Sequence, residues 1–313
     1  MSDARTAVIA LGGNALSPPG ERATIADQFR HTRSSVASIV ELALDGWKLC
    51  VVHGNGPQVG DELTRNEIAG AEVEPLPLGV LVASTAGWIG YMIQQSLENA
   101  LRRAGSRRDV VTVITQVEVS PDDPALADPT KFIGHDLTED RARALEKRGH
   151  AVKQDEGKYR RVVGSPAPRA VHEMDIITSL VRRGTIVIAC GGGGVPVYCD
   201  AQLGLEGVDA VVDKDLVAAV MATGLGAELF MILTDVEAVY SDYGTPRQLP
   251  LAKMTVRDAE RLDAAGAFGE GSMAPKVRAA VDYVRRTRGR AIIADLAQGR
   301  DAVRGAAGTT ILP

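Results

Sequence analysis

Short, continuously apolar runs recur along the chain and predict β-strands. They lack the alternation of polar and apolar positions that a half-exposed strand shows, which is typical of parallel strands covered on both faces. We therefore predict buried, largely parallel strands. They are expected at residues 7–11, 48–53, 109–119, 185–190, 229–234 and 291–296.

The segments between these runs have apolar residues at helical spacing. Gly46, Gly105 and Gly184 follow three of them, and glycine is the residue that most often ends a helix. Helices are expected at residues 25–45, 81–104, 172–183, 215–223, 255–265 and 274–287. This alternation of strand and helix predicts an α/β fold, an open αβα sandwich with a largely parallel central sheet.

Two stretches interrupt the alternation. Residues 120–168 are rich in Pro, Asp and Lys around an expected helix at 137–148, which predicts an inserted lid subdomain outside the main sheet. Residues 239–249 contain the turn sequence YSDYGTP and predict a hairpin.

Composition narrows the classes of protein. With 313 residues, 45% hydrophobic and 24% charged, the chain has the balance of a soluble globular protein. Its net charge of −5 gives no general attraction to nucleic acid or to an anionic membrane. The first residues have no secretory signal pattern and no apolar run is long enough to span a bilayer, so a cytoplasmic location is expected. The three cysteines have no zinc-binding spacing, and an odd number suggests no disulfide framework.

Three glycine-rich loops each begin where an apolar run ends: LGGNAL at 11–16, HGNGPQVG at 53–60 and CGGGGVPV at 190–197. Such loops let backbone N–H groups approach an anion closely. A lone glycine-rich turn is more often a simple chain reversal. Because ligands of open α/β sheets bind outside the carboxyl ends of the strands, three such loops predict one crevice for a polyanionic ligand.

The common phosphate-binding motifs do not explain these loops. The chain has no GxxxxGK[ST] sequence, and HGNGPQVG places its last glycine one residue too far for GxGxxG. Neither the protein-kinase motifs HRD and DFG nor the hydrolase motif GxSxG occurs.

Two segments contain lysines that could bind an anion. Asp213, Lys214 and Asp215 stand just before an expected helix, and Lys276 falls in the first turn of another. A lysine is electrostatically unfavourable at a helix N-terminus, which suggests an anionic partner rather than a solvated side chain.

In this order, LGGNAL, HGNGPQVG, DPTKFIG, CGGGGVPV, VDKD, LTDVEAVY and GSMAPK resemble the bacterial carbamate kinases of the amino-acid kinase superfamily, over essentially the whole chain. The resemblance implies a homodimer that moves a phosphoryl group reversibly between ATP and carbamate with Mg²⁺. It also implies ATP formation from ADP and carbamoyl phosphate in arginine catabolism. Residues 81–97, which contain Trp88, Tyr91 and Met92, are a candidate dimer helix, although packing on the sheet explains them equally well.

The resemblance also implies roles for residues. Lys131 would reach over the transferred group, Lys214 and Lys276 would neutralise phosphate oxygens, and Asp215 would orient the lysines or Mg²⁺. The substrate-binding residues would be Gly12, Gly13, Asn14, Gly54, Asn55 and Gly56. The nucleotide-binding residues would be Gly192, Gly193, Thr234, Asp235, Val236, Tyr240, Met273, Ala274 and Lys276.

The same resemblance divides the single domain, 1–313, into two parts. Residues from about 1 to 210, with the lid at about 120–168, would bind carbamoyl phosphate, and residues from about 211 to 313 would bind the nucleotide. The lid departs from the family pattern at Phe132, where a proline is usual, and at EGKYRR, which is one residue shorter.

The residue types suit this chemistry. Carbamate already carries a negative oxygen, so it needs no general base, and His53 at the end of an apolar run is interpreted as structural. Two alternatives stay open. One is a kinase of the same superfamily that acts on another small acid or a phosphonate, and the other is a non-catalytic sensor that binds nucleotide or carbamoyl phosphate.

Overall fold

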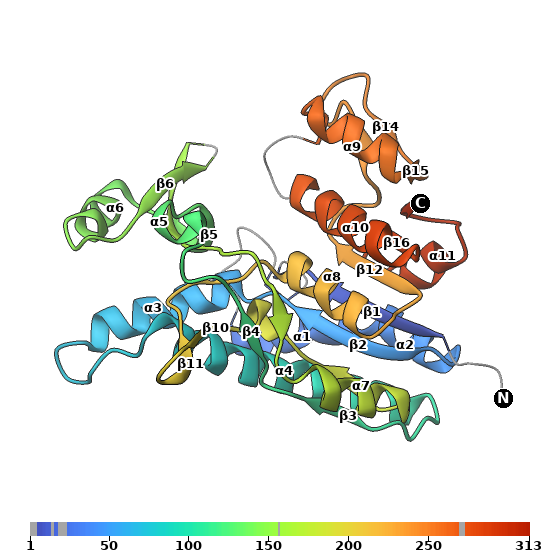
Figure 1. Cartoon of the computed structure of the whole chain (residues 1–313), viewed down its shortest axis with the longest axis horizontal. Helices are drawn as coiled ribbons and strands as arrows, with labels where there is room; N and C mark the ends of the chain where they lie inside the picture. The colour runs from blue at the N-terminus through green and yellow to red at the C-terminus, as the bar shows by residue number, and fades with distance from the viewer. Residues whose placement is uncertain (1–4, 14–15, 18–23, 156, 269–272) are drawn as a thin grey trace.

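The central feature of the protein, described here by a computed structural model, is one twisted, mostly parallel sheet (Figure 1). The structure describes residues 5–13, 16–17, 24–155, 157–268 and 273–313. In this part of the chain the main sheet has eight strands in the order β15-β17-β16-β12-β1-β2-β9-β3. All its pairings are parallel except β16 with β17. The strands are β1 (Thr6–Leu11), β2 (Lys48–His53), β3 (Val110–Thr112), β9 (Ile186–Ile188), β12 (Leu229–Thr234), β15 (Lys253–Thr255), β16 (Arg290–Asp295) and β17 (Thr309–Leu312).

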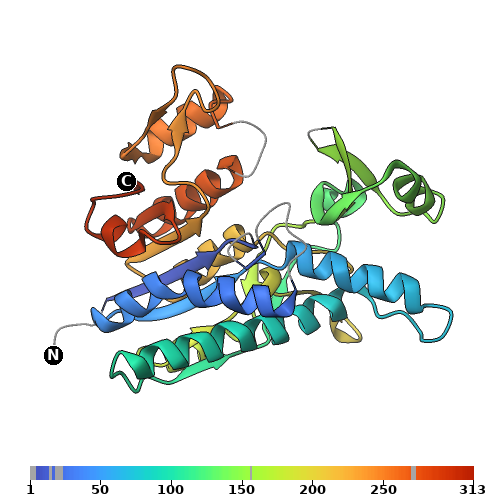
Figure 2. The ribbon, with the colours of Figure 1, turned by 180° about the vertical axis from the view of Figure 1, so that it is seen from behind.

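Helices cover both faces of this sheet, as the apolar runs predict. Successive residues of a strand point to opposite faces, so Val8 and Ala10 of β1 pack in one core and Ala7 and Ile9 in another. Figure 1 shows α7, α8 and α10 on the first face, and Figure 2 shows α1, α2 and α4 on the second. The helices of the two layers are α1 (Ile25–Ser35), α2 (Ala37–Leu44), α4 (Leu78–Arg103), α7 (Met174–Arg182), α8 (Lys214–Gly224), α10 (Met273–Thr287) and α11 (Gly299–Val303). The predicted αβα sandwich is therefore confirmed.

Smaller sheets and further helices surround the main sheet. The further helices of the described residues are α3 (Gly56–Ala69), α5 (Pro124–Ala127), α6 (Glu139–Glu146), α9 (Val256–Ala264) and the 3₁₀ turn η2 (Gly191–Gly193). One side sheet contains β4 (Gln116–Glu118), β8 (Ala170–Val171), β10 (Val195–Asp200) and β11 (Gly204–Gly207). The insert contains β5 (Lys131–Leu137), β6 (Val152–Asp155) and β7 (Lys158–Val163), and Figure 1 shows it projecting from the main sheet with α6. No helix among the described residues combines the length and the apolarity needed to cross a membrane.

The predicted hairpin at 239–249 is present, because β13 (Tyr240–Ser241) pairs antiparallel with β14 (Leu249–Pro250). Two other predictions are wrong in detail. The expected strand 109–119 is divided into β3 and β4, which belong to different sheets. The break lies at Thr115, whose hydroxyl donates to the Val113 carbonyl and accepts from the Cys190 N–H in place of a regular ladder bond.

The expected helix 25–45 is two helices that meet at Val36. The hydroxyls of Thr32 and Ser35 donate to the carbonyls of Gln28 and His31, one turn earlier. Hydroxyl bonds of this kind compete with the helical ladder and bend helices. The break thus falls where two such residues occur in the last turn of α1.

Candidate functional site

The glycine-rich loops meet at the carboxyl ends of three neighbouring strands of the main sheet, as predicted. They follow β1, β2 and β9, which are neighbours in the strand order. The Gly12 N–H donates to the Leu233 carbonyl at 3.1 Å, and the Gly54 N–H donates to the Leu11 carbonyl at 3.1 Å. A Cβ on Gly54 would lie 3.2 Å from the Gly13 nitrogen, so these loops are in direct contact. Asn14, also predicted for this site, lies outside the described residues.

Three lysines and two aspartates gather at these strand ends, and we call them the lysine cluster. They are Lys131, Lys214, Lys276, Asp213 and Asp215. The Lys214 ammonium lies 2.8 Å from Asp215 Oδ2, and the Lys276 ammonium lies 3.7 Å from the same oxygen. Lys214 begins α8 and Lys276 lies in the first turn of α10, so two helix N-termini converge here.

Lys131 enters this cluster from the insert. It begins β5, and its ammonium pairs with Asp213. Asp213 is the N-cap of α8, where its Oδ1 accepts from the Asp215 N–H at 2.8 Å. The Asp213 carboxylate therefore stabilises the start of α8 and pairs with the Lys131 ammonium of the insert.

Burial and neighbouring charge oppose each other in the pKa values of the cluster. Burial disfavours the ammonium of Lys214, but Asp215 and Asp213 outweigh it and raise the Lys214 pKa. Lys276 shows the reverse: burial and then the Lys214 charge lower its pKa. Burial favours the neutral acid of Asp213, yet Lys131 and Lys214 hold its pKa far below the ordinary value. Three lysines against two aspartates leave positive charge for an incoming anion.

One oxygen of Asp215 is left unpaired by the residues that the structure describes. The Asp215 side chain is buried, and among those residues Oδ1 has no hydrogen-bond partner, while Oδ2 faces both lysines. Mg²⁺ is commonly bound by one or two carboxylates together with substrate phosphates and water. The Asp215 Oδ1 atom has the chemistry of such a carboxylate ligand to Mg²⁺. Among the described residues, no group of three or more His, Cys, Asp or Glu side chains has the arrangement of a metal site.

The third glycine loop packs on Asn55 and on the chain before α8. A Cβ on Gly192 would lie 2.3 Å from the Asn55 amide nitrogen, and one on Gly193 would lie 2.1 Å from the Val212 carbonyl oxygen. Gly193 also has a φ of +92°, which disfavours other residues. Asn55 itself is buried and donates to the Thr85 hydroxyl at 2.9 Å. The loop between β9 and β10 is thereby fixed against the second glycine loop and the chain before α8.

The residues predicted to bind the nucleotide lie beside the lysine cluster only in part. Thr234 ends β12, and its hydroxyl donates to Asp235 at 3.0 Å; the Asp235 charge contributes to the raised pKa of Lys214. Met273 and Ala274 begin α10, the helix of Lys276. Val236 follows on the loop after β12, whereas Tyr240 lies in β13, where its ring is 6.0 Å from that of Tyr243.

Three features of the site are not evident from the sequence motifs. Asp213 stands just before an expected helix, but its two roles as N-cap of α8 and partner of Lys131 are not part of the motif. Thr85, the partner of Asn55, comes from the middle of α4 and has no motif of its own. The last glycine of HGNGPQVG, Gly60, contacts the lid: a Cβ there would lie 2.1 Å from the Gly134 Cα.

The insert is attached to α3 by charge as well as by this close contact. Glu67 of α3 forms ion pairs with Arg141 and Arg161 of the insert, and the Glu67 side chain is only 13% exposed. The two places where the sequence is expected to depart from the resembled motifs contact each other, since the Arg160 guanidinium lies 5.2 Å from the centre of the Phe132 ring. A cation–π contact thus links the two departures within one β5–β7 pair.

His53 is buried at the end of β2, where its ring contacts the backbone. Its Nδ1 lies 2.9 Å from the Gly54 carbonyl, and burial lowers its pKa from 6.5 to about 4. The folded protein therefore holds this histidine neutral at pH values where the unfolded chain would protonate it.

This pKa predicts an acid dependence of stability. Between about pH 6.5 and 4 the unfolded state binds a proton that the folded state does not, so the free energy of unfolding falls as the pH falls through this window. From pH 7.5 to 5 we expect His53 to account for a loss of about 2 kcal/mol. Urea unfolding at both pH values would measure it, with His53→Asn as the comparison. An equal pH dependence in both proteins would contradict the prediction.

Comparisons of the sequence and of the structure with known proteins all point to the same family. The model of the amino acid kinase family matches residues 5–295. Carbamate kinase from Pyrococcus furiosus is 42% identical over 311 residues, with 98% of each chain covered. Carbamate kinase from Halobacterium salinarum is 46% identical over 309 residues, again with 98% of each covered. The structure of carbamate kinase from Giardia lamblia bound to AMP-PNP superposes with a TM-score of 0.91 at 36% identity, covering 100% of this chain and 99% of the other.

Proposed function

Since the chain belongs to the amino acid kinase family and, within it, to the carbamate kinases, we propose that the lysine cluster and the glycine loops form its phosphoryl-transfer site. The observation that carries this proposal is the meeting of Lys214, Asp215 and Lys276 at the edge where β1, β2 and β9 end. Backbone amides and ammonium groups are what a transferring phosphoryl group requires.

The substrate side would be formed by Gly12, Gly13 and Asn14 together with Gly54, Asn55 and Gly56. Gly54 supports this assignment, because a Cβ there would lie 3.1 Å from Cδ of Lys214. The phosphoryl group would therefore lie between the backbone of these loops and the lysines. The nucleotide would bind on the other side, over Gly192 and Gly193, the segment from Thr234 to Val236, Tyr240 and the start of α10. The Giardia relative was solved with AMP-PNP, which supports a nucleotide substrate.

Each charged group would have a separate role. Lys214 and Lys276 would neutralise oxygens of the transferring phosphoryl group, and Asp215 would hold both lysines in position. Lys131 would leave Asp213 to reach the same group when substrate binds. Mg²⁺, held by Asp215 Oδ1 and substrate phosphates, would supply further neutralisation of charge.

No general base is required for this reaction. Carbamate attacks with an oxygen that is already anionic, so proton abstraction is not part of the step. His53, the histidine nearest the loops in sequence, is buried and neutral. The site thus acts by positioning and by electrostatic stabilisation.

Other properties of the family belong to this proposal as well. The protein would be a homodimer, with the α4 segment 81–97 as a contributing surface, and it would be cytoplasmic and form ATP in arginine catabolism. Residues from about 1 to 210, with the lid at about 120–168, would bind carbamoyl phosphate, and residues from about 211 to 313 would bind the nucleotide. In α4, Tyr91 is 54% exposed whereas Met92 is buried, so the helix has one face on the core and another open to a partner.

The test is ATP formation from ADP and carbamoyl phosphate with Mg²⁺, followed by a coupled assay. We expect turnover that depends on both substrates and on the metal. Nucleotide binding without turnover would indicate the non-catalytic sensor, and turnover only with a different phosphoryl donor would indicate a related kinase. Either result would overturn the proposal.

A further inference from the structure

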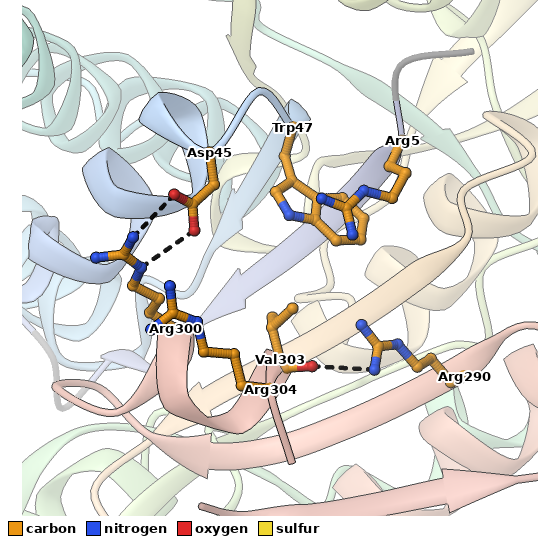
Figure 3. Close-up of a pocket in the computed structure, with 7 residues that line it drawn as sticks. All are labelled: Arg5, Asp45, Trp47, Arg290, Arg300, Val303 and Arg304. Atoms are coloured by element: carbon orange, nitrogen blue, oxygen red, sulfur yellow. Dashed lines mark hydrogen bonds and ion pairs between the residues drawn. The ribbon is translucent and has the colours of Figure 1, made fainter. Parts of the chain in front are cut away.

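A second concentration of positive charge lies at the opposite end of the main sheet from the lysine cluster, where β1, β2 and β16 begin. Figure 3 shows the side chains that line it. It lines a pocket of about 430 Å³. We call it the arginine pocket; its lining residues are Arg5, Asp45, Trp47, Arg290, Arg300, Val303 and Arg304. Arg5 and Trp47 directly precede β1 and β2, and Arg290 begins β16. Because the lysine cluster lies beyond the carboxyl ends of these strands, one strand length, roughly 20 Å, separates the two sites.

One of the four guanidinium groups is matched by a carboxylate of the pocket. Arg300 donates from Nη2 and Nε to the two oxygens of Asp45, at 2.9 and 3.1 Å. This bidentate pair has a fixed geometry and leaves Asp45 neutralised. Asp45 is the single acidic residue among the described residues that line the pocket.

The other arginines have neutral neighbours in the pocket. The Arg5 guanidinium lies 4.4 Å from the centre of the Trp47 ring, and Arg290 Nη1 donates to the Val303 carbonyl at 3.1 Å. Arg304 follows α11, and Figure 3 shows its side chain running beside Arg300. Among the described residues that line the pocket, four arginines against one aspartate give a charge of +3, in a chain whose net charge is −5.

We propose that the arginine pocket binds a small anion that carries two or more phosphate groups. Arginine stays protonated in proteins, so the pocket cannot relieve its charge by releasing protons. The guanidinium fork matches phosphate oxygens in pairs. Two phosphate groups carry a charge of roughly −3 to −4 at neutral pH, which balances the pocket. The volume also lies within the range of small-ligand sites.

The pocket recognises phosphate rather than a nucleobase. Trp47 is its aromatic residue, but the ring is only 2% exposed and Arg5 covers it, so no flat apolar surface is open for stacking. The remaining lining is guanidinium and carboxylate, apart from Val303. Since the pocket and the lysine cluster lie at opposite strand ends, an anion bound here does not compete with the substrates of phosphoryl transfer.

Calorimetric titration with Mg²⁺-free pyrophosphate tests the proposal. We expect a binding event at the arginine pocket, separate from any pyrophosphate bound by the lysine cluster, whose Kd rises about tenfold in Arg304→Gln, because a charge-assisted hydrogen bond is lost. Lys276→Ala, in the lysine cluster, should leave this event unchanged, and so should Arg257→Gln on α9. Orthophosphate should bind at least about tenfold more weakly, since it carries half the charge.

Two further measurements keep the test decisive. Arg5→Gln should weaken pyrophosphate binding in the same way, and thermal unfolding of each variant shows whether it is folded. With ADP as the probe in the Lys276→Ala background, binding that is sensitive to Arg304→Gln would identify nucleotide phosphates as one source of the ligand. Pyrophosphate binding that is insensitive to Arg304→Gln and Arg5→Gln, or that disappears in Lys276→Ala, would overturn the proposal.

Discussion

Lys214→Ala is expected to lower kcat for ATP formation by about three powers of ten. Two unit charges about 4 Å apart interact by roughly 4 kcal/mol at an effective dielectric constant near 20, and each 1.4 kcal/mol is a factor of ten in rate. Lys276→Ala is expected to have a similar effect, because its ammonium lies within 3.7 Å of the same Asp215 oxygen. Steady-state kinetics with varied carbamoyl phosphate and ADP would measure both.

The design of this experiment separates charge from folding. Each variant removes a largely buried cation and changes the surroundings of Asp215, so thermal unfolding must accompany the kinetics. Lys253→Ala removes an exposed lysine of β15 and serves as the matched control, with kcat expected to stay near that of the original protein. Lys214→Arg is not expected to restore the rate, since a planar guanidinium does not reproduce the compact ammonium charge that lies 2.8 Å from Asp215 Oδ2. Near-full turnover of both alanine variants would show that the site assignment is wrong.

Gly60→Ala is expected to lower kcat about tenfold to a hundredfold. The new methyl group would lie 2.1 Å from the Gly134 Cα and 2.4 Å from the Gly134 nitrogen, which are backbone atoms that no rotamer change can move. The lid strand β5 must therefore shift away from α3, and Lys131 at its start shifts with it. A displacement of about 1 Å at a catalytic group costs on the order of a hundredfold in rate, and overpacking of this kind costs about 1–3 kcal/mol of stability.

Gly87→Ala is the matched control for this experiment. Gly87 also lies inside a helix, α4, but a Cβ there would make only an ordinary contact of 3.8 Å with Ile114. Alanine is the better helix former, so this variant should keep its activity and gain up to about 1 kcal/mol of stability in urea unfolding. If Gly60→Ala had the same activity as Gly87→Ala, the packing of α3 against β5 would not position Lys131.

The lysine cluster draws on distant parts of the chain, because Lys131 begins β5 of the insert while Lys214 and Lys276 lie in the first turns of α8 and α10. Figure 1 shows these elements, with the insert projecting from the main sheet. The motifs around these lysines could be recognised one at a time, and their order indicated the family. The pairing of Lys131 with Asp213 could not be predicted, because the two residues are 82 positions apart and their contact depends on how the insert folds back. The same holds for Asn55 with Thr85 and for the contact of Gly60 with Gly134.

The sequence by itself determined the α/β class, most of the strands and helices, and the positions of the glycine-rich loops. These follow from local patterns: continuous apolar runs, helical spacing, and glycines where the runs end. Hydroxyl and turn interactions limited this local prediction, as the division of 109–119 at Thr115 and of 25–45 at Val36 shows.

Only the tertiary structure decided which charges meet. It brought Lys131, Lys214 and Lys276 to two aspartates at one end of the sheet and Arg5, Arg290, Arg300 and Arg304 to a pocket at the other. The physical reason is that strand order and helix packing set these contacts through interactions between residues far apart in the chain. No local periodicity records such interactions, and burial then fixes the electrostatic properties of the groups that meet.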